Sequence, residues 1–133
     1  IDEEAVIHNA EILKTQFVAE IDFLRNARHY YQYGKLLITH AGFDSTAENW
    51  QDTSKQDFLW IREHYLQPNQ TGLINIFGHT PTRNMHKIDD IWISPCQSYI
   101  GIDGGCAYGG QLNALLISEQ GEILETFVEH SDK

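Results

Sequence analysis

The sequence predicts an α/β protein of the mixed α+β kind, in which helices pack on a mixed β-sheet. Helical periodicity dominates the first third of the chain. Short apolar runs of strand length follow, separated first by a helical segment and later only by turns. The chain has 133 residues, 41% of them hydrophobic, which suits one packed domain over residues 1–133.

The first predicted element is an amphipathic helix or helix pair over residues 6–24. Spacings of three and four place its apolar residues on one face: Val6, Ala10, Leu13, Phe17, Ile21 and Leu24. A buried strand is expected over 35–39, ending at His40-Ala41-Gly42. The capping box Ser54-Lys55-Gln56-Asp57 then predicts a helix of about three turns that continues through Leu66.

A second buried strand is expected over 73–77 and ends at Gly78-His79-Thr80-Pro81. Short strands are predicted after it, over 91–93, 99–103, 113–118 and 123–128. The last two flank a glycine-containing connection of hairpin length. The order of elements therefore favours a mixed sheet that ends in antiparallel strands.

Charge and composition exclude several classes of function. Nine Lys and Arg face 19 Asp and Glu, a net charge of −10, which argues against a nucleic-acid partner. No apolar stretch approaches the length of a membrane span, and the acidic start Ile1-Asp2-Glu3-Glu4 is unlike a signal peptide. Cys96 and Cys106 lack metal or disulfide spacing and are expected to be buried thiols. We therefore expect a cytoplasmic protein.

Two predicted strands end in a histidine with a glycine within two positions, His40 before Gly42 and His79 after Gly78. Ligands of such sheets bind beyond the carboxyl ends of the strands, where two such histidines can converge. Neutral imidazole is a good ligand for Zn, Mn or Fe, so a shared metal is one interpretation. The alternative is that both are ordinary hydrogen-bonded histidines at strand ends.

Arg62 is a candidate for phosphate binding. It follows the apolar stretch Phe58-Leu59-Trp60-Ile61, which should anchor its helix and hold the guanidinium toward the same crevice. The alternative is a surface arginine paired with Glu63 or another acid.

The glycine-rich stretch 101–110 lacks the spacing of a dinucleotide fingerprint or a P-loop. It is able to bring Asp103 and Tyr108 close to a ligand, or it is a tight turn between strands that needs several positive φ angles. The other histidines lack partners at ligand spacing and are expected to be surface or capping residues: His8, His29, His64, His86 and His130.

Four motifs in order resemble the carboxyl-terminal half of the calcineurin-like metallophosphoesterases. They are His40-Ala41-Gly42, Phe58 to Arg62, Phe77-Gly78-His79-Thr80-Pro81, and Ile102-Asp103-Gly104-Gly105 through Gly109-Gly110-Gln111-Leu112. The likeness is greatest to bacterial serine/threonine protein phosphatases of the phosphoprotein phosphatase type, and it spans essentially the whole chain.

The resemblance implies half of an αββα sandwich that carries two divalent metal ions, manganese in many members, with Fe or Zn as alternatives. It implies that His40 and His79 bind the second metal and that Arg62 contacts the substrate phosphate. The implied reaction is hydrolysis of a phosphate monoester by metal-activated water. The substrate would be a phosphoprotein.

The chain departs from the family in lacking GDxHG, GDxxDRG and GNH[ED], the amino-terminal motifs that supply the other ligands. Ile1 would lie just downstream of GNH[ED], so we expect a fragment of the catalytic domain. Two imidazoles alone make at most a loose metal site, and the chain alone should be a poor phosphatase or none. A homodimer is one way to cover the face that the missing half would occupy.

Two alternatives stay open. The first is a phosphoesterase that acts on small molecules, such as a dinucleoside tetraphosphatase, which shares the two histidine motifs. The second is a binding domain without catalysis that has kept the fold. Retention of His40, Arg62 and His79 argues against the second.

Overall fold

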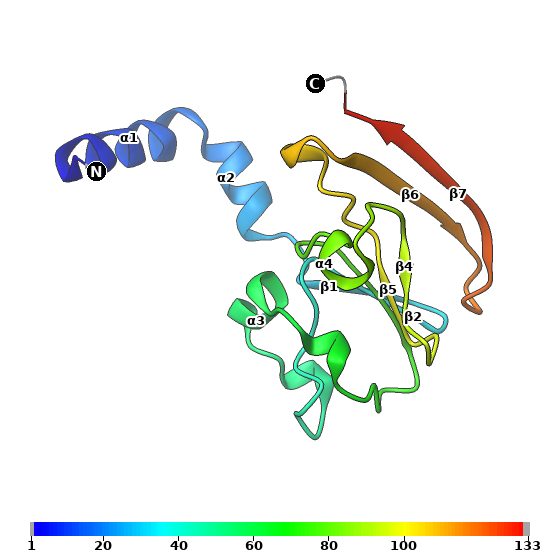
Figure 1. Cartoon of the computed structure of the whole chain (residues 1–133). Coiled ribbons are helices and arrows are strands. Elements are labelled where there is room, and N and C mark those ends of the chain that lie inside the picture. Colours follow the sequence, from blue (N-terminus) through cyan, green and yellow to red (C-terminus); the bar gives the residue numbers. More distant parts are fainter. Residues whose placement is uncertain (1, 132–133) are drawn as a thin grey trace.

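The computed structural model describes residues 2–131 and is mixed α+β, as the sequence predicts (Figure 1). Its helices are α1 (Glu3–Gln16), α2 (Val18–Arg25), α3 (Lys55–Trp60) and α4 (Arg83–His86). Its strands are β1 (Tyr30–Tyr33), β2 (Leu36–Thr39), β3 (Ile74–Phe77), β4 (Trp92–Ile93), β5 (Tyr99–Gly101), β6 (Gln111–Ile117) and β7 (Ile123–His130).

The larger sheet has the strand order β1-β2-β3-β5-β4. Its three central strands are parallel, with Ile38 of β2 opposite Ile76 of β3 and Ile76 opposite Ile100 of β5. The edge strands β1 and β4 run antiparallel to their neighbours, so the predicted mixed sheet is confirmed. The carboxyl ends of β2 and β3 therefore lie side by side at one edge of the sheet.

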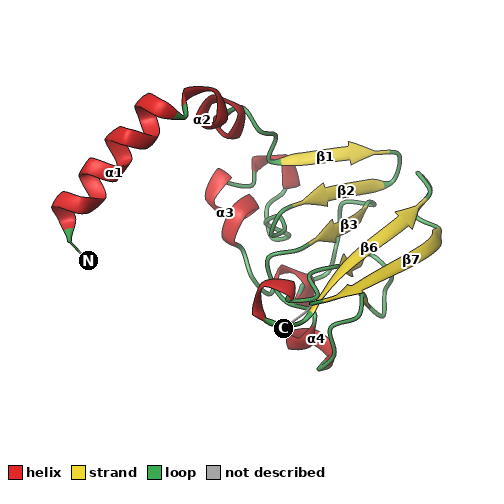
Figure 2. Cartoon of the chain, turned by 90° about the horizontal axis from the view of Figure 1, so that it is seen from above, coloured by secondary structure: helices red, strands yellow, loops and turns green. Residues whose placement is uncertain are grey.

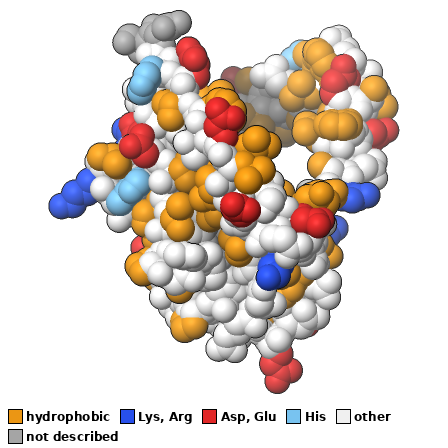
Figure 3. Space-filling model, turned by 90° about the vertical axis from the view of Figure 1, so that its right-hand side faces the viewer, with side chains coloured by type: hydrophobic (Ala, Val, Ile, Leu, Met, Phe, Trp, Pro, Cys, Tyr) orange, Lys and Arg blue, Asp and Glu red, His pale blue; other side chains and the backbone are white. Residues whose placement is uncertain are grey.

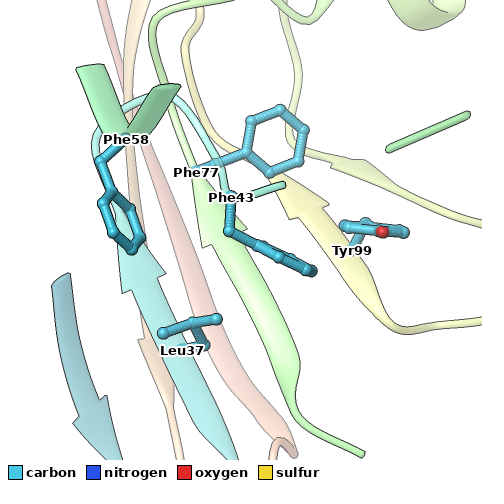
Figure 4. Close-up of a cluster of buried hydrophobic side chains, with 5 residues drawn as sticks. All are labelled: Leu37, Phe43, Phe58, Phe77 and Tyr99. Carbon is cyan, nitrogen blue, oxygen red and sulfur yellow. The ribbon is translucent and has the colours of Figure 1, made fainter. Parts of the chain in front are cut away.

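Alternating side chains of the central strands build a core on each face of this sheet. One core contains Leu37, Phe43, Phe58, Phe77 and Tyr99 (Figure 4), and Phe58 comes from α3. The other core contains Leu36, Ile76 and Ile100 and packs against the β6–β7 hairpin through Leu115, Ile117 and Ile123. Both cores form because neighbouring residues of one strand face opposite sides.

The predicted hairpin is confirmed as a separate two-stranded sheet, β6 and β7. Leu112, Leu116, Leu124, Phe127 and Val128 of this hairpin are exposed. Figure 3, which faces this side of the molecule, shows hydrophobic side chains on the surface. A second sheet of only two strands leaves much of its own apolar surface uncovered.

The amino-terminal helix pair is confirmed, but its apolar face does not pack on the sheet. Neither α1 nor α2 has a buried residue, and both extend away from the sheets in two views (Figures 1 and 2). Exposed apolar side chains on the pair include Ile7, Phe23 and Leu24. The expectation that these helices cover the sheet is therefore wrong for the chain alone.

The helix that begins at the capping box is shorter than predicted. Ser54 caps it as expected, because its hydroxyl accepts from the Asp57 amide at 3.0 Å. The helix ends at Trp60, Ile61 is extended, and a 3-10 turn follows over His64–Leu66. None of the helices in residues 2–131 is both long and apolar enough to cross a bilayer.

Candidate functional site

The two histidines that follow β2 and β3 converge, as the strand ends predict. The Gly78 amide donates to the His40 carbonyl at 2.8 Å and carries the hydrogen bonding of the sheet beyond the strands. The imidazole centroids of His40 and His79 lie 5.1 Å apart, with the rings inclined by 54°. His79 has a left-handed backbone with φ of 64°. The site thus begins where two parallel strands end.

His79 lies in a partly buried environment that favours its neutral form. Its Nε2 is buried without a hydrogen-bond partner, and the indole of Trp60 meets its ring edge-on. Burial lowers the pKa of His79, and the positive charge of Arg62 and the neighbouring His40 ring lower it further. Asp103 opposes these effects and raises it. The ring therefore stays unprotonated, and able to bind a cation, to a lower pH than a free imidazole.

Arg62 lies in the loop after α3 rather than on the helix itself. The Ala41 amide donates to the Phe58 carbonyl at 3.0 Å, which ties α3 to the segment that follows His40. Within residues 2–131, no carboxylate lies within 4.0 Å of its guanidinium, so the alternative of a pair with Glu63 is wrong. Glu63 instead takes a left-handed backbone with φ of 63° and turns the chain back into the core. The guanidinium is left exposed and free to bind an anion.

The residues present fit one half of a divalent-metal site. Two imidazoles on one tetrahedral metal, each about 2 Å from it, have centroids about 5 Å apart, close to the separation of His40 and His79. The unpartnered Nε2 of His79 is the kind of buried polar atom that a metal satisfies. The described residues contain no group of three or more metal-binding side chains. The histidine pair is therefore a partial ligand set.

The glycine-rich stretch is a tight turn, one of the two interpretations that the sequence allows. Gly105 and Gly109 have positive φ values of 66° and 79°, and Asp103 accepts a hydrogen bond from the Gly105 amide at 2.8 Å. Asp103 is near enough to His79 to act on its pKa, whereas the side chain of Tyr108 is 79% exposed. The turn therefore brings only Asp103 toward the site.

Sequence reasoning missed His64, which is not a surface residue. Its side chain is 3% exposed, and its Nε2 lies 2.9 Å from Oδ1 of Asn75. Burial lowers the pKa of His64 to about 4, against the smaller opposite effect of the Asn75 hydrogen bond. No local pattern reveals this, because Asn75 lies on β3, beyond an intervening loop.

The cysteines also differ from the expectation of buried thiols. Cys96 is exposed and Cys106 is intermediate, and both are free. The hydroxyls of Ser94 and Ser98 lie 3.3 and 3.0 Å from the Cys96 sulfur and lower its pKa to about 7. Neither cysteine lies in the site.

Two cavities of about 560 Å³ each are found in the described part of the chain, and neither is lined by His40, Arg62 or His79. The first lies among the loops that follow β2 and the 3-10 turn, between Asp44 and Trp50 and between Gln67 and Thr71. The second lies between β1 and α3, with Tyr30 and Phe58 in its wall. The candidate site therefore lies outside both of these cavities.

Comparisons with protein-family models, with curated proteins and with solved structures found no match to this chain.

Proposed function

We propose that this chain carries part of the active site of a metal-dependent phosphoesterase, most similar to the calcineurin-like serine/threonine protein phosphatases. The observation that supports it most is the convergence of His40 and His79, with centroids 5.1 Å apart at neighbouring strand ends. Arg62 has no ion-pair partner in the described structure, and its charge lowers the pKa of the His79 ring. A cation-binding pair beside a free guanidinium is the arrangement that phosphoester hydrolysis needs.

In this proposal the chain's residues bind and orient. His40 and His79 hold one of two divalent ions, preferably Mn²⁺, through neutral imidazole nitrogens. The bound metals would supply charge neutralisation and a water of lowered pKa. Arg62 binds two oxygens of the phosphate in a forked contact and neutralises the charge that gathers there.

The proposal also requires ligands beyond this pair. Catalytic metals use three protein ligands and an open position, and the second ion needs a ligand set of its own. These groups must be brought to the pair from elsewhere, for example by a second copy of the chain. We therefore expect the chain alone to bind Mn²⁺ weakly and to hydrolyse phosphoesters slowly or not at all. The free thiols of Cys96 and Cys106 suit a reducing compartment, so we propose the cytoplasm.

Mn²⁺ broadening of histidine ring signals in NMR spectra tests the proposal, because it detects weak binding. We expect selective broadening of His40 and His79 in the wild-type chain. Affinity should fall about tenfold or more in His79→Ala and stay unchanged in His86→Ala, whose histidine lies on α4. Uniform broadening of all histidines, or equal affinity in both variants, would reject the metal site.

Hydrolysis of p-nitrophenyl phosphate with Mn²⁺ provides a second measurement. We expect little turnover by the chain, in line with its partial ligand set. Mn²⁺-dependent turnover that disappears in His79→Ala would support the function and show that copies of the chain complete one another's sites. Turnover that persists in His79→Ala would reject the assigned ligand.

A further inference from the structure

His64 is buried among the aromatic side chains of the core that contains Phe43, Phe77 and Tyr99. Four aromatic rings surround its imidazole, with centroids from 4.5 Å at Phe77 to 5.8 Å at Phe43 and Tyr65, and Tyr99 at 5.4 Å. Apolar neighbours of this kind do not require a histidine, since phenylalanine or leucine would fill the same space. A polar ring here therefore calls for another explanation.

The explanation lies in a chain of buried hydrogen bonds. The Asn75 side chain donates through Nδ2 to the Leu37 carbonyl and to Oγ1 of Thr39, each at 3.0 Å. Because its amide nitrogen faces these two acceptors, its Oδ1 must face His64. The His64 ring therefore donates from Nε2, at 2.9 Å, and is held in one tautomer. Every polar atom of the Asn75 amide then has a partner.

This network touches each segment that carries a candidate site residue. Thr39 directly precedes His40, and His64 follows Arg62 by two positions. Phe77, whose ring is nearest to that of His64, precedes His79 by two positions. The His64 imidazole thus reaches the strand end before His40 through Asn75 and contacts Phe77 near the strand end before His79. It also belongs to the loop that carries Arg62.

Gly42 tightens this arrangement. A Cβ atom at Gly42 would lie 2.5 Å from Nδ1 and 2.7 Å from Nε2 of His64, so the backbone after His40 passes in contact with the imidazole. The left-handed Glu63 turns the chain so that Arg62 remains outside while His64 enters the core. Position 42 can only be glycine if His64 is to keep this place.

We infer that His64 is a positioning residue, which holds the loop of Arg62 against the strand ends of His40 and His79 through Asn75 and Thr39. The functional consequence of this inference rests on the proposed function, whereas the contacts of His64 do not depend on a bound metal. His64 reaches neither substrate nor metal. It acts by fixing the separation of the three residues that do.

The test compares His64→Phe with His64→Gln. Phenylalanine fits the aromatic surroundings but removes the donor to Asn75, whereas the glutamine amide can still donate. His86→Phe is the matched control, because His86 also lies 2.9 Å from an acceptor, the Asp90 carbonyl, but is on α4. Thermal unfolding shows first that each variant is folded.

The first measurement needs no metal: the nuclear Overhauser effect between the ring protons of His40 and His79. We expect the effect to be lost or reduced severalfold in His64→Phe and retained in His64→Gln and His86→Phe. A merely structural role would lower the unfolding temperature of a folded variant without changing this effect. An unchanged effect in folded His64→Phe would overturn the inference. If His64→Phe does not fold, Thr39→Val, which removes one acceptor of Asn75 at constant volume, should reduce the effect, and an unchanged effect would overturn it.

The second measurement is Mn²⁺ affinity. We expect His64→Phe to bind Mn²⁺ about tenfold more weakly than wild type, and His64→Gln to stay within about threefold, as for other residues that orient metal ligands. Equal affinity in wild type and folded His64→Phe would count against positioning. A wild-type chain that shows the ring-to-ring effect but binds no Mn²⁺ would reject the proposed function, and the first measurement would still decide the role of His64.

Discussion

The indole of Trp60 lies edge-on to the imidazole of His79, with centroids 5.3 Å apart and an angle of 86° between the planes. Trp60 ends α3, whereas His79 follows β3, so this contact joins the arginine loop to the second histidine. A tryptophan at this distance reports on the state of the imidazole, since a protonated imidazole quenches indole fluorescence.

Fluorescence should therefore follow the protonation of His79. As the pH is lowered, we expect emission to fall with a midpoint below 6.5, because burial and Arg62 lower the pKa of His79. The transition should vanish in Trp60→Phe and remain in Trp92→Phe, whose indole packs on Tyr65 instead. A transition that persists in Trp60→Phe would contradict the contact.

Arg62 should shift the same titration. In Arg62→Met, loss of the neighbouring positive charge should raise the pKa of His79, while Asp103→Asn should lower it, because the carboxylate favours the charged imidazolium. Arg28→Met removes the same charge elsewhere and serves as the control. NMR titration of the His79 ring gives each value directly. Shifts of the same sign in Arg62→Met and Asp103→Asn would show that this electrostatic account is wrong.

Acid should destabilise the fold through His64. Unfolded chains bind a proton at this residue below about 6.5, whereas the folded protein binds it only near pH 4. The free energy of unfolding should thus fall as the pH is lowered across this window, by on the order of 3 kcal/mol in total. Urea unfolding at several pH values measures it. The free energy of unfolding of His64→Gln should depend less steeply on pH. An equally steep dependence would show that other groups cause the loss of stability.

Glycine substitutions should separate steric conflict from backbone strain. A Cβ at Gly110 would collide with the backbone carbonyl oxygen of Gly104 and would also lie 2.5 Å from the Arg83 guanidinium, which pairs with Asp89. Gly72 has φ of 72° but nothing within 4 Å of a Cβ. We expect Gly110→Ala to cost about 2–4 kcal/mol and Gly72→Ala about 1 kcal/mol. Urea unfolding of both variants compares them, and a reversed order would contradict the packing of this turn.

The exposed apolar helices should make the chain self-associate. Phe23 and Leu24 are 76% and 69% exposed, and burying two such side chains is worth several kcal/mol. Light scattering coupled to gel filtration should show a mass that rises with concentration. A Phe23→Lys, Leu24→Lys variant should stay monomeric, unlike Tyr108→Ser, which alters an exposed side chain on a turn. If the wild-type chain is monomeric at all concentrations, this surface does not cause self-association.

Local patterns predicted the parts of the fold that local interactions determine. The apolar runs of β2 and β3, the Ser54 cap and the β6–β7 hairpin each depend on neighbours in sequence, and all are confirmed. Strand β1 was missed, because Tyr30–Tyr33 has no apolar run and becomes a strand by pairing with β2. The predicted end of α3 was wrong, since tertiary contacts of His64 override the helical pattern there.

For the candidate site, too, the sequence predicts what local patterns determine and not what depends on contacts between distant segments. Convergence of His40 and His79 follows from the position of two strand ends, which the sequence marks with glycine. The roles of Trp60, His64 and Asn75 depend on contacts between distant segments and leave no spacing signal. Metal binding and phosphate binding stay predictions, to be decided by the measurements above.

The left-handed backbones of Glu63 and His79 lower the stability of the fold at the candidate site. Four non-glycine residues among 2–131 have positive φ, and two of them lie at the candidate site, His79 as a member of it and Glu63 directly after Arg62. Each such conformation costs on the order of 1 kcal/mol relative to glycine, a noticeable fraction of the roughly 5–15 kcal/mol that stabilises a typical domain. Glu63→Gly would relieve the backbone strain at position 63 and leave His40, Arg62 and His79 unchanged. This substitution is therefore the one expected to raise the unfolding temperature. At position 79, glycine would also relieve the backbone strain but would remove the imidazole. A gain in stability at this residue would therefore be a loss of the proposed metal ligand.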